Sequence, residues 1–284
     1  MKLFLTGGTG FVGSHLLRVL STSMHEVQAL RRPGSEPCIG IGAAPQWLEK
    51  GMDQLDAADF AGVDVLVHLA SVGVSPKTAT WQELFHWNVQ VMLDLMEKAH
   101  AAGVRRFVLA GSFAEYGLSA DKYDALPPDA ALLPTSPYAA SKAAGFIAAN
   151  AFAIDKKVEL CYLRIFSAFG EGQYINNFWP ALRAAALAGQ DFSMTPGAQV
   201  RDFVPVEQVA RSILAAIEDP ALAAKGQPYV ANVGSGEPVT MLAFAERQWA
   251  AWGATGRIIA GAKPYRPNEP MRFVPQMNNK EVQQ

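Results

Sequence analysis

The sequence predicts an α/β protein built on a doubly wound parallel sheet, and three observations lead to this class. A short apolar run at residues 2–5 leads into a glycine-rich turn and then into a segment with helical spacing. Further apolar runs of strand length recur along the chain, separated by helical segments. Half of the 284 residues are hydrophobic, which is enough for a large core. Alternating strands and helices are typical of a parallel sheet that helices cover on both faces.

The first strand leads into a turn whose glycines are spaced three residues apart. A residue without Cβ suits a tight turn and lets the backbone approach a pyrophosphate closely. The helix that follows offers free N–H groups to the same ligand. We therefore expect a dinucleotide here, and the alternative is a glycine-rich turn without a ligand. The expected contacts are Gly7, Gly10, Phe11, Val12 and Gly13.

The second strand is expected at residues 26–30, and two arginines follow it. Arg31 and Arg32 occupy the place where NAD-binding folds usually carry an acidic residue for the adenosine ribose. Guanidinium groups suit a 2′-phosphate, so NADP(H) is the favoured cofactor and NAD(H) stays possible. A solvated basic turn is the alternative. Asp53 could touch the adenine or cap a short element.

The strand expected at residues 63–70 ends at Ser71, whose small side chain would let the cofactor lie against the backbone. His68, inside this run, is interpreted as a core histidine. The helix expected from 81 to 102 carries Asn88 on its inner side. Asn88 could hydrogen-bond main chain near the site, with a cap or a buried polar contact as the alternative. Further cofactor contacts are expected at Leu69, Ala70, Ser71, Asn88, Ala110 and Ile165.

The strand at residues 105–110 is followed by Ser112, and a later helix carries Tyr138 and Lys142 on one face, at i and i+4. The three side chains are expected to meet, because ligands bind at the carboxyl edge of such a sheet. A phenol has a pKa near ~10, which a nearby ammonium group lowers. Tyr138 could then exchange a proton with a sugar hydroxyl or ketone while hydride moves, and Ser112 would hold the same oxygen.

Later elements are expected as a strand at 160–166, a polar-aromatic loop at 170–180, a helix at 181–188, a strand at 200–206, a helix at 207–218 and a strand at 229–233.

Composition narrows the class of protein. A net charge of −2 disfavours nucleic acid or an anionic membrane as a partner. The two cysteines lack metal-like spacing and fit a reducing compartment, and no metal site is expected. No apolar run approaches the ~18 residues of a membrane span, and no signal-peptide core follows the N-terminus. We therefore expect a soluble, cytoplasmic protein.

Several motifs together resemble the extended short-chain dehydrogenases/reductases, in particular the NAD(P)-dependent nucleotide-sugar epimerase/dehydratase family. They are TGGTGFVG (6–13), VHLAS (67–71), Asn88, FVLAGSFAEYG (107–117), SPYAASK (136–142), LRIFSAFGEGQ (163–173), VRDFVPVEQVA (200–210) and YRPNE (265–269). The resemblance implies a seven-stranded parallel Rossmann sheet with a small C-terminal α/β lobe for substrate. The dinucleotide-binding domain would comprise residues 1–166 and about 198–233, and the lobe about 167–197 and 234–284.

The resemblance also implies site residues and a homodimer joined through helices at 81–100 and 138–153. The catalytic residues would be Ser112, Tyr138 and Lys142. The substrate would be a nucleotide-diphosphate sugar. Its implied contacts are Ser112, Phe113, Ser167, Asn177, Arg201, Arg266 and Glu269.

Departures from the family pattern narrow the reaction. Members that dehydrate sugars carry an Asp-Glu pair where this chain has Phe113 and Ala114. Members that epimerise at C3 and C5 use a cysteine at the position of Phe113. We therefore expect 4-keto reduction or C4 epimerisation. The alternatives are an NADPH-dependent reductase of a small aldehyde or ketone, and a non-catalytic NADP-binding regulator.

Overall fold

The computed structural model describes residues 1–74, 77–265 and 270–277. Its centre is a seven-stranded sheet in the order β10-β6-β5-β4-β1-β2-β3, and every neighbouring pair is parallel. The strands are β1 (Lys2–Thr6), β2 (Glu26–Arg31), β3 (Gln46–Glu49), β4 (Val65–His68), β5 (Arg106–Ser112), β6 (Glu159–Ile165) and β10 (Tyr229–Val233). The predicted doubly wound parallel sheet is confirmed.

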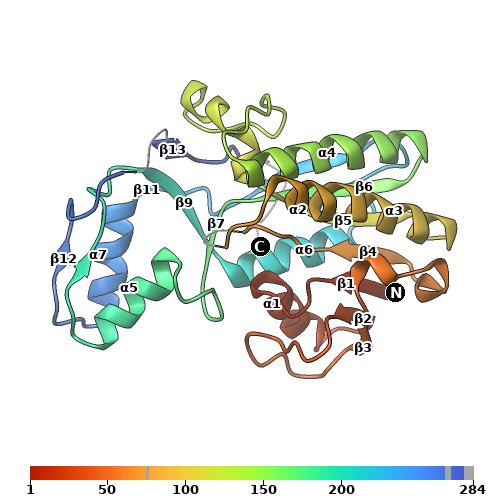
Figure 1. Cartoon of the computed structure of the whole chain (residues 1–284), viewed down its shortest axis with the longest axis horizontal. Helices are drawn as coiled ribbons and strands as arrows, with labels where there is room; N and C mark the ends of the chain where they lie inside the picture. Colours follow the sequence, from red (N-terminus) through yellow and green to blue (C-terminus); the bar gives the residue numbers. More distant parts are fainter. Residues whose placement is uncertain (75–76, 266–269, 278–284) are drawn as a thin grey trace.

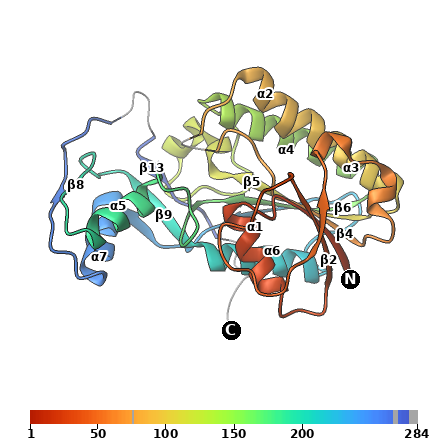
Figure 2. The same cartoon turned by 60° about the horizontal axis from the view of Figure 1, so that its bottom comes forward.

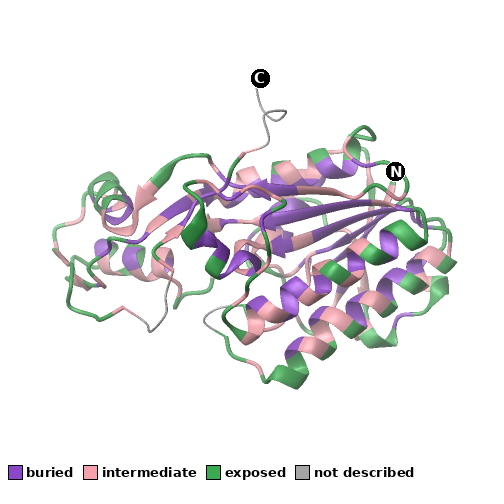
Figure 3. Ribbon diagram, turned by 90° about the horizontal axis from the view of Figure 1, so that it is seen from above, coloured by how far each residue is buried: buried purple, intermediate pink, exposed green. Residues whose placement is uncertain are grey.

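Helices cover both faces of this sheet (Figures 1 and 2). One face packs on α1 (Phe11–Leu20) and α6 (Val206–Glu218). The other packs on α3 (Met92–Ala101) and α4 (Pro137–Asp155). Side chains alternate across each strand: in β1, Leu3 and Leu5 enter the first core and Phe4 enters the second. The sheet is therefore buried on both faces (Figure 3).

The helix predicted at 81–102 is continuous but not uniform. It consists of α2 (Trp81–Phe85), a π-helical segment η3 (His86–Val91) and α3. The start of α4 has a clear cause in the sequence, because the Ser136 side chain accepts a hydrogen bond from the N–H of Ala139 and Pro137 fills the first turn. Four short 3₁₀ segments complete this part: η1 (Met52–Gln54), η2 (Ala57–Phe60), η4 (Phe113–Tyr116) and η5 (Leu118–Lys122).

A smaller α/β lobe stands at one end of the sheet (Figure 1). In its four-stranded sheet, β9 (Val200–Pro205) pairs with β7 (Ser167–Phe169), β11 (Pro238–Thr240) and β13 (Arg272–Phe273). The remaining elements are α5 (Phe178–Leu187), α7 (Met241–Ala251), β8 (Phe192–Ser193) and β12 (Ile258–Ile259). The domain division predicted from the sequence assigned residues from about 198 to 233, and so β9, to the dinucleotide-binding domain. Among the described residues, β9 pairs only with strands of the small sheet, and the domain boundaries themselves stay a prediction.

Candidate active site

The glycine turn between β1 and α1 fits a dinucleotide. Gly7 has a φ of +78°, and a Cβ there would lie 2.7 Å from the backbone nitrogen of Ala70. A Cβ on Gly13 would lie 2.1 Å from the carbonyl oxygen of Gly7. α1 begins at Phe11 after Gly10, which has no side chain to cap the helix, so the first N–H groups stay available to a phosphate.

Ser112, Tyr138 and Lys142 come together at the carboxyl edge of the sheet, as the sequence predicted. Ser112 ends β5 and the other two lie on α4. The side chains of Ser112 and Ser71 lie near the Tyr138 hydroxyl, and each lowers its pKa as a hydrogen-bonding group. Lys142 is 7% exposed, and its ammonium donates to the carbonyl oxygen of Ala110 over 2.7 Å. A phenol, a serine hydroxyl and a buried cation therefore come together at this edge of the sheet, with Ser112 and Tyr138 partly exposed.

Burial governs protonation at this place. It raises the pKa of Tyr138 to about 12, and hydrogen bonds from Ser112 and Ser71 oppose it only in part. Burial also lowers the pKa of Lys142, which the Glu115 carboxylate opposes. The expected lowering of the Tyr138 pKa is therefore wrong for the protein without cofactor, because desolvation of the phenolate and the nearby Glu115 charge outweigh the two serine hydroxyls. His68 is buried, and desolvation together with Lys142 lowers its pKa to about 3.

Asn88 supports the same site from the π-helical segment. Its side-chain nitrogen donates to the carbonyl of Val72 and to the hydroxyl of Ser141, each over 3.0 Å. Its oxygen accepts from the N–H of Val72 over 2.9 Å and from the Ser71 hydroxyl over 3.2 Å. The expected hydrogen bonds to main chain near the site are confirmed. π-Helical turns are frequent at functional sites, and here the turn aims one amide at the loop after β4.

Arg31, at the end of β2, is already paired. Its guanidinium contacts the Glu49 carboxylate at 2.6 Å and the Glu36 carboxylate at 2.9 Å, and it lies over the ring of Trp47 at 5.1 Å. Arg32 is exposed. The neutralised Arg31 offers less net charge to a 2′-phosphate than the sequence suggested.

The remaining predicted cofactor contacts lie at or near the carboxyl ends of the strands. Asp53 lies in η1, beyond the end of β3. Leu69 and Ala70 directly follow β4, and the N–H of Leu69 donates to the carbonyl oxygen of Thr6 over 3.2 Å. Ile165 ends β6 opposite Ser112. These residues thus lie toward the same edge of the sheet as the glycine turn, and their contact with a cofactor stays a prediction.

The predicted substrate residues lie on the side of the small lobe. Phe113 packs against the rings of Phe166 and Phe273, with centroids 5.6 and 4.9 Å away. Ser167 begins β7, and Asn177 precedes α5 without capping it through its side chain. Of the remaining predicted contacts, Arg201 is described by the structure. Arg266 and Glu269 lie outside the described residues.

Arg201 lies on β9 and is 8% exposed. Its guanidinium donates to the carbonyl oxygens of Val200 over 3.0 Å and of Pro270 over 2.8 Å. The side chain is thus fixed by the main chain around it.

Sequence reasoning missed a buried polar cluster next to the predicted catalytic residues. Glu115 and Arg164 form an ion pair of 2.6 Å with side-chain exposures of 0% and 1%. The available signal was Arg164 itself, a charge inside the apolar strand Leu160 to Phe166. Among the described residues, no group of three or more His, Cys, Asp or Glu side chains is arranged to hold a metal ion. No helix in these same residues is long and apolar enough to cross a membrane.

The sheet order, the glycine turn and the serine–tyrosine–lysine trio define a dinucleotide-dependent enzyme of the extended short-chain dehydrogenase/reductase type. The model of the NAD dependent epimerase/dehydratase family matches residues 3–234, and the chain belongs to this family.

Two curated relatives cover most of the chain. A CDP-abequose synthase from Salmonella muenchen is 25% identical over 95% of this chain and 87% of its own length. A UDP-glucose 4-epimerase from Neisseria meningitidis serogroup B is 28% identical over 94% of this chain and 87% of its own length.

Solved structures agree with the fold. An NAD-dependent NDP-hexosamine 5,6-dehydratase, TunA, is 30% identical with a TM-score of 0.84, over 97% of this chain and 89% of that one. MoeE5 in complex with UDP-glucuronic acid and NAD is 28% identical with a TM-score of 0.83, over 98% of this chain and 90% of that one.

Proposed function

We propose that this enzyme reduces a 4-keto group or inverts C4 of a nucleotide-diphosphate sugar, with Tyr138 as the acid/base group. The observation that carries the proposal is the meeting of Tyr138 and Lys142 on α4 with Ser112 at the carboxyl end of β5, where the Ser112 side chain influences the pKa of the Tyr138 hydroxyl. In a bound substrate, the same two hydroxyls would hold the oxygen on the reacting carbon. The dinucleotide, when bound, supplies the hydride acceptor or donor.

The protein's part in the reaction is proton transfer and alignment. In the reductive direction the protonated Tyr138 donates to the developing alkoxide, which suits its high pKa. In the oxidative direction it must first lose its proton, and the Lys142 ammonium favours the phenolate. Ser112 stabilises the oxygen in both directions by hydrogen bonding.

The residues at positions 113 and 114 favour reaction at C4 over dehydration. Phe113 and Ala114 stand where dehydrating members carry an acid and a base, and the Phe113 ring packs among aromatic side chains. Curated relatives include enzymes named as 4-epimerases, a CDP-abequose synthase and 4,6-dehydratases. An elimination needs a group to remove one proton and another to protonate the leaving oxygen, and phenylalanine and alanine can do neither.

The substrate proposal rests on the small lobe. Arg201 and the start of α5 at Asn177 are suited to a diphosphate, because a guanidinium and a helix N-terminus both favour phosphate oxygens. NADP(H) stays the prediction from the two arginines after β2, with Arg32 exposed and Arg31 offset by two carboxylates. The family dependence is on NAD, so NAD(H) is the cofactor to test beside it.

Calorimetry with NADH, NADPH and a panel of nucleotide diphosphates tests this function. We expect one nucleotide diphosphate to bind, and Arg201→Ala to weaken that binding. Tyr138→Phe should bind cofactor as the wild type does and lose turnover of the matching 4-ketosugar by about 10³-fold. Cofactor binding without any nucleotide binding would instead favour a small-carbonyl reductase. Unchanged turnover in Tyr138→Phe would refute Tyr138 as the acid/base group.

The proposal includes a cytoplasmic homodimer joined through α2–α3 and α4. Large apolar side chains are exposed on this side of the molecule, at Trp81, Ile147 and Ile154. Light scattering of the purified protein should give twice the chain mass. Ile147→Glu should give a monomer, because a charge cannot be buried in an apolar interface without a partner.

A further inference from the structure

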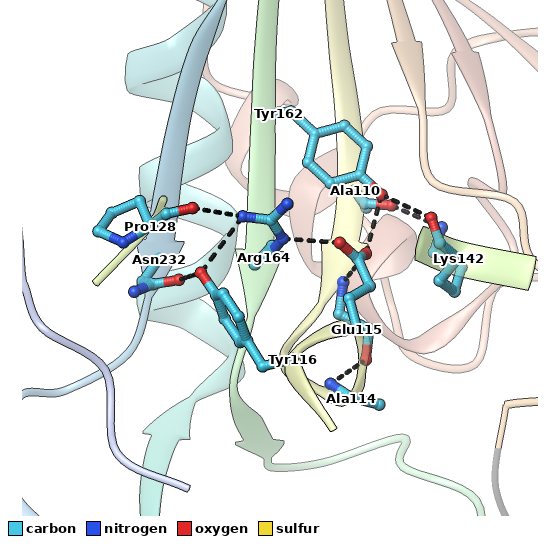
Figure 4. Close-up of polar contacts among 10 residues, drawn as sticks. Ala110, Ala114, Glu115, Tyr116, Pro128, Lys142, Tyr162, Arg164 and Asn232 are labelled. Atoms are coloured by element: carbon cyan, nitrogen blue, oxygen red, sulfur yellow. Dashed lines mark hydrogen bonds and ion pairs between the residues drawn. The ribbon is translucent and has the colours of Figure 1, made fainter. Parts of the chain in front are cut away.

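The carboxylate of Glu115 lies beneath the catalytic residues and makes three hydrogen bonds (Figure 4). One oxygen accepts from the backbone N–H of Ser112 over 2.8 Å and from the hydroxyl of Tyr162 over 2.8 Å. The other accepts from the Nε of Arg164 over 2.6 Å. With 0% exposure, this carboxylate has exchanged all of its water for these protein donors.

The guanidinium of Arg164 is enclosed in the same way. It donates to the carbonyl of Pro128 over 2.7 Å and to the hydroxyl of Tyr116 over 3.3 Å. It also lies over the rings of Phe146 and Tyr116, at 4.3 and 4.9 Å. Tyr116 in turn donates to Asn232 on β10 over 2.6 Å. Figure 4 shows the guanidinium between Glu115 on one side and Pro128, Tyr116 and Asn232 on the other.

Glu115 is also connected to the helix that carries the tyrosine and the lysine. The hydroxyl of Tyr162 lies 3.4 Å from the carbonyl oxygen of Lys142, besides donating to Glu115. The Lys142 ammonium is bound to the carbonyl of Ala110 on β5, two residues before Ser112. A single buried carboxylate thus joins the end of β5, strand β6 and helix α4.

We propose that Glu115 and Arg164 are positioning residues for the reaction described above: the carboxylate fixes Ser112, and the guanidinium balances the carboxylate's charge next to Tyr138 and Lys142. This inference rests on the proposed function, since it assigns a role in the same proton transfer. Neither residue needs to touch substrate or cofactor.

The charges around Tyr138 and Lys142 determine in which direction the pKa of Tyr138 changes when the Glu115 charge is removed. Glu115 raises the pKa of both Tyr138 and Lys142. Among the described residues, the titratable and charged groups around Glu115 and Tyr138 are His68 of β4, Glu115 and Tyr116 of η4, Tyr138 and Lys142 of α4, and Tyr162 and Arg164 of β6. Arg106 of β5 and Glu159 of β6 pair with each other at the opposite end of these two strands. His68 is neutral near pH 7, because its pKa is lowered to about 3. Loss of the Glu115 charge therefore leaves Arg164 unbalanced, and a guanidinium cannot neutralise itself by losing a proton.

The test is the titration of Tyr138 in the NAD-bound protein, followed as tyrosinate absorbance after subtraction of the Tyr138→Phe protein. Glu115→Gln should move this titration about one pH unit lower, since an unbalanced cation favours the phenolate. Adding Arg164→Met to Glu115→Gln should return it toward the wild-type position. Glu159→Gln removes the partner of Arg106 at the other end of the same strands and is the matched control that should not move the titration.

An unmoved titration in a folded Glu115→Gln protein, or an equal shift in Glu159→Gln, would overturn the proposal. If Glu115→Gln does not fold, the proposal is tested with two double variants that lack both charges. One combines Arg164→Met with Glu115→Gln, and the other combines Arg164→Met with Glu115→Leu. Only the glutamine keeps an oxygen for the Ser112 N–H, so kcat should be about tenfold lower with leucine while cofactor binding is equal. Equal kcat values would overturn the proposal. The titration needs no turnover, so its outcome is separate from that of the proposed function.

Discussion

Buried His68 predicts a specific dependence of stability on pH. The residue ends β4, is 3% exposed and shares a hydrogen bond of 2.8 Å with the Thr6 hydroxyl. Its pKa is about 3 in the folded protein, whereas an exposed histidine has a pKa of about 6.5. Between about pH 3 and about pH 6.5, His68 is protonated in the unfolded chain and neutral in the folded chain. Lowering the pH in this range therefore favours unfolding.

The magnitude follows from the two pKa values. Each unit of difference in pKa is worth about 1.36 kcal/mol. His68 therefore lowers the free energy of unfolding by up to about 5 kcal/mol once the pH is below its folded pKa. From pH 7 to pH 5 the free energy of unfolding should fall by about 2 kcal/mol because of this residue. The effect is absent above the unfolded pKa and increases steadily as the pH falls below it.

Urea unfolding at several pH values measures this contribution. The informative quantity is the difference between wild type and His68→Asn, which keeps a partner for the Thr6 hydroxyl. The difference should narrow by about 2 kcal/mol between pH 7 and pH 5, since the variant has no proton to gain. A constant difference in His68→Asn would refute the reasoning.

The cofactor site gives two further predictions. Gly13→Ala would place a Cβ 2.1 Å from the Gly7 carbonyl, so dinucleotide affinity should fall at least about tenfold by calorimetry, whereas Gly40→Ala, with open space at its Cβ, should bind as the wild type does. Glu49→Gln would free Arg31 from its nearer carboxylate, so the ratio of NADPH to NADH affinity should rise several-fold in a fluorescence titration. An unchanged ratio would mean that Arg31 does not lie near the ribose 2′ position.

The sequence predicted the large sheet well because its signals are local. The glycines, the apolar runs and the i, i+4 spacing of Tyr138 and Lys142 each act over a few residues, and parallel strands then bring their carboxyl ends together. The trio needed only that geometry. The start of α4 was also predictable, because Ser136 and Pro137 form a local helix start.

Other features depend on contacts between residues far apart in the sequence. The ion pair of Glu115 and Arg164 spans 49 positions, and neither side chain has a local pattern that names the other. The pairing of Arg31 with Glu49 needs the register of β2 against β3. The high pKa of Tyr138 depends on how completely the folded chain excludes water, which no motif of residue types conveys.

The small sheet has a consequence for how the chain acquires its structure. Its strands β7, β9, β11 and β13 come from segments spread between residue 167 and residue 273. The other three strands each pair with β9. During synthesis, six of the seven strands of the large sheet are complete once residue 165 has been added, whereas the small sheet still lacks all four of its strands. Assembly should therefore proceed from the dinucleotide side outward, and the small sheet closes last, when β13 becomes available.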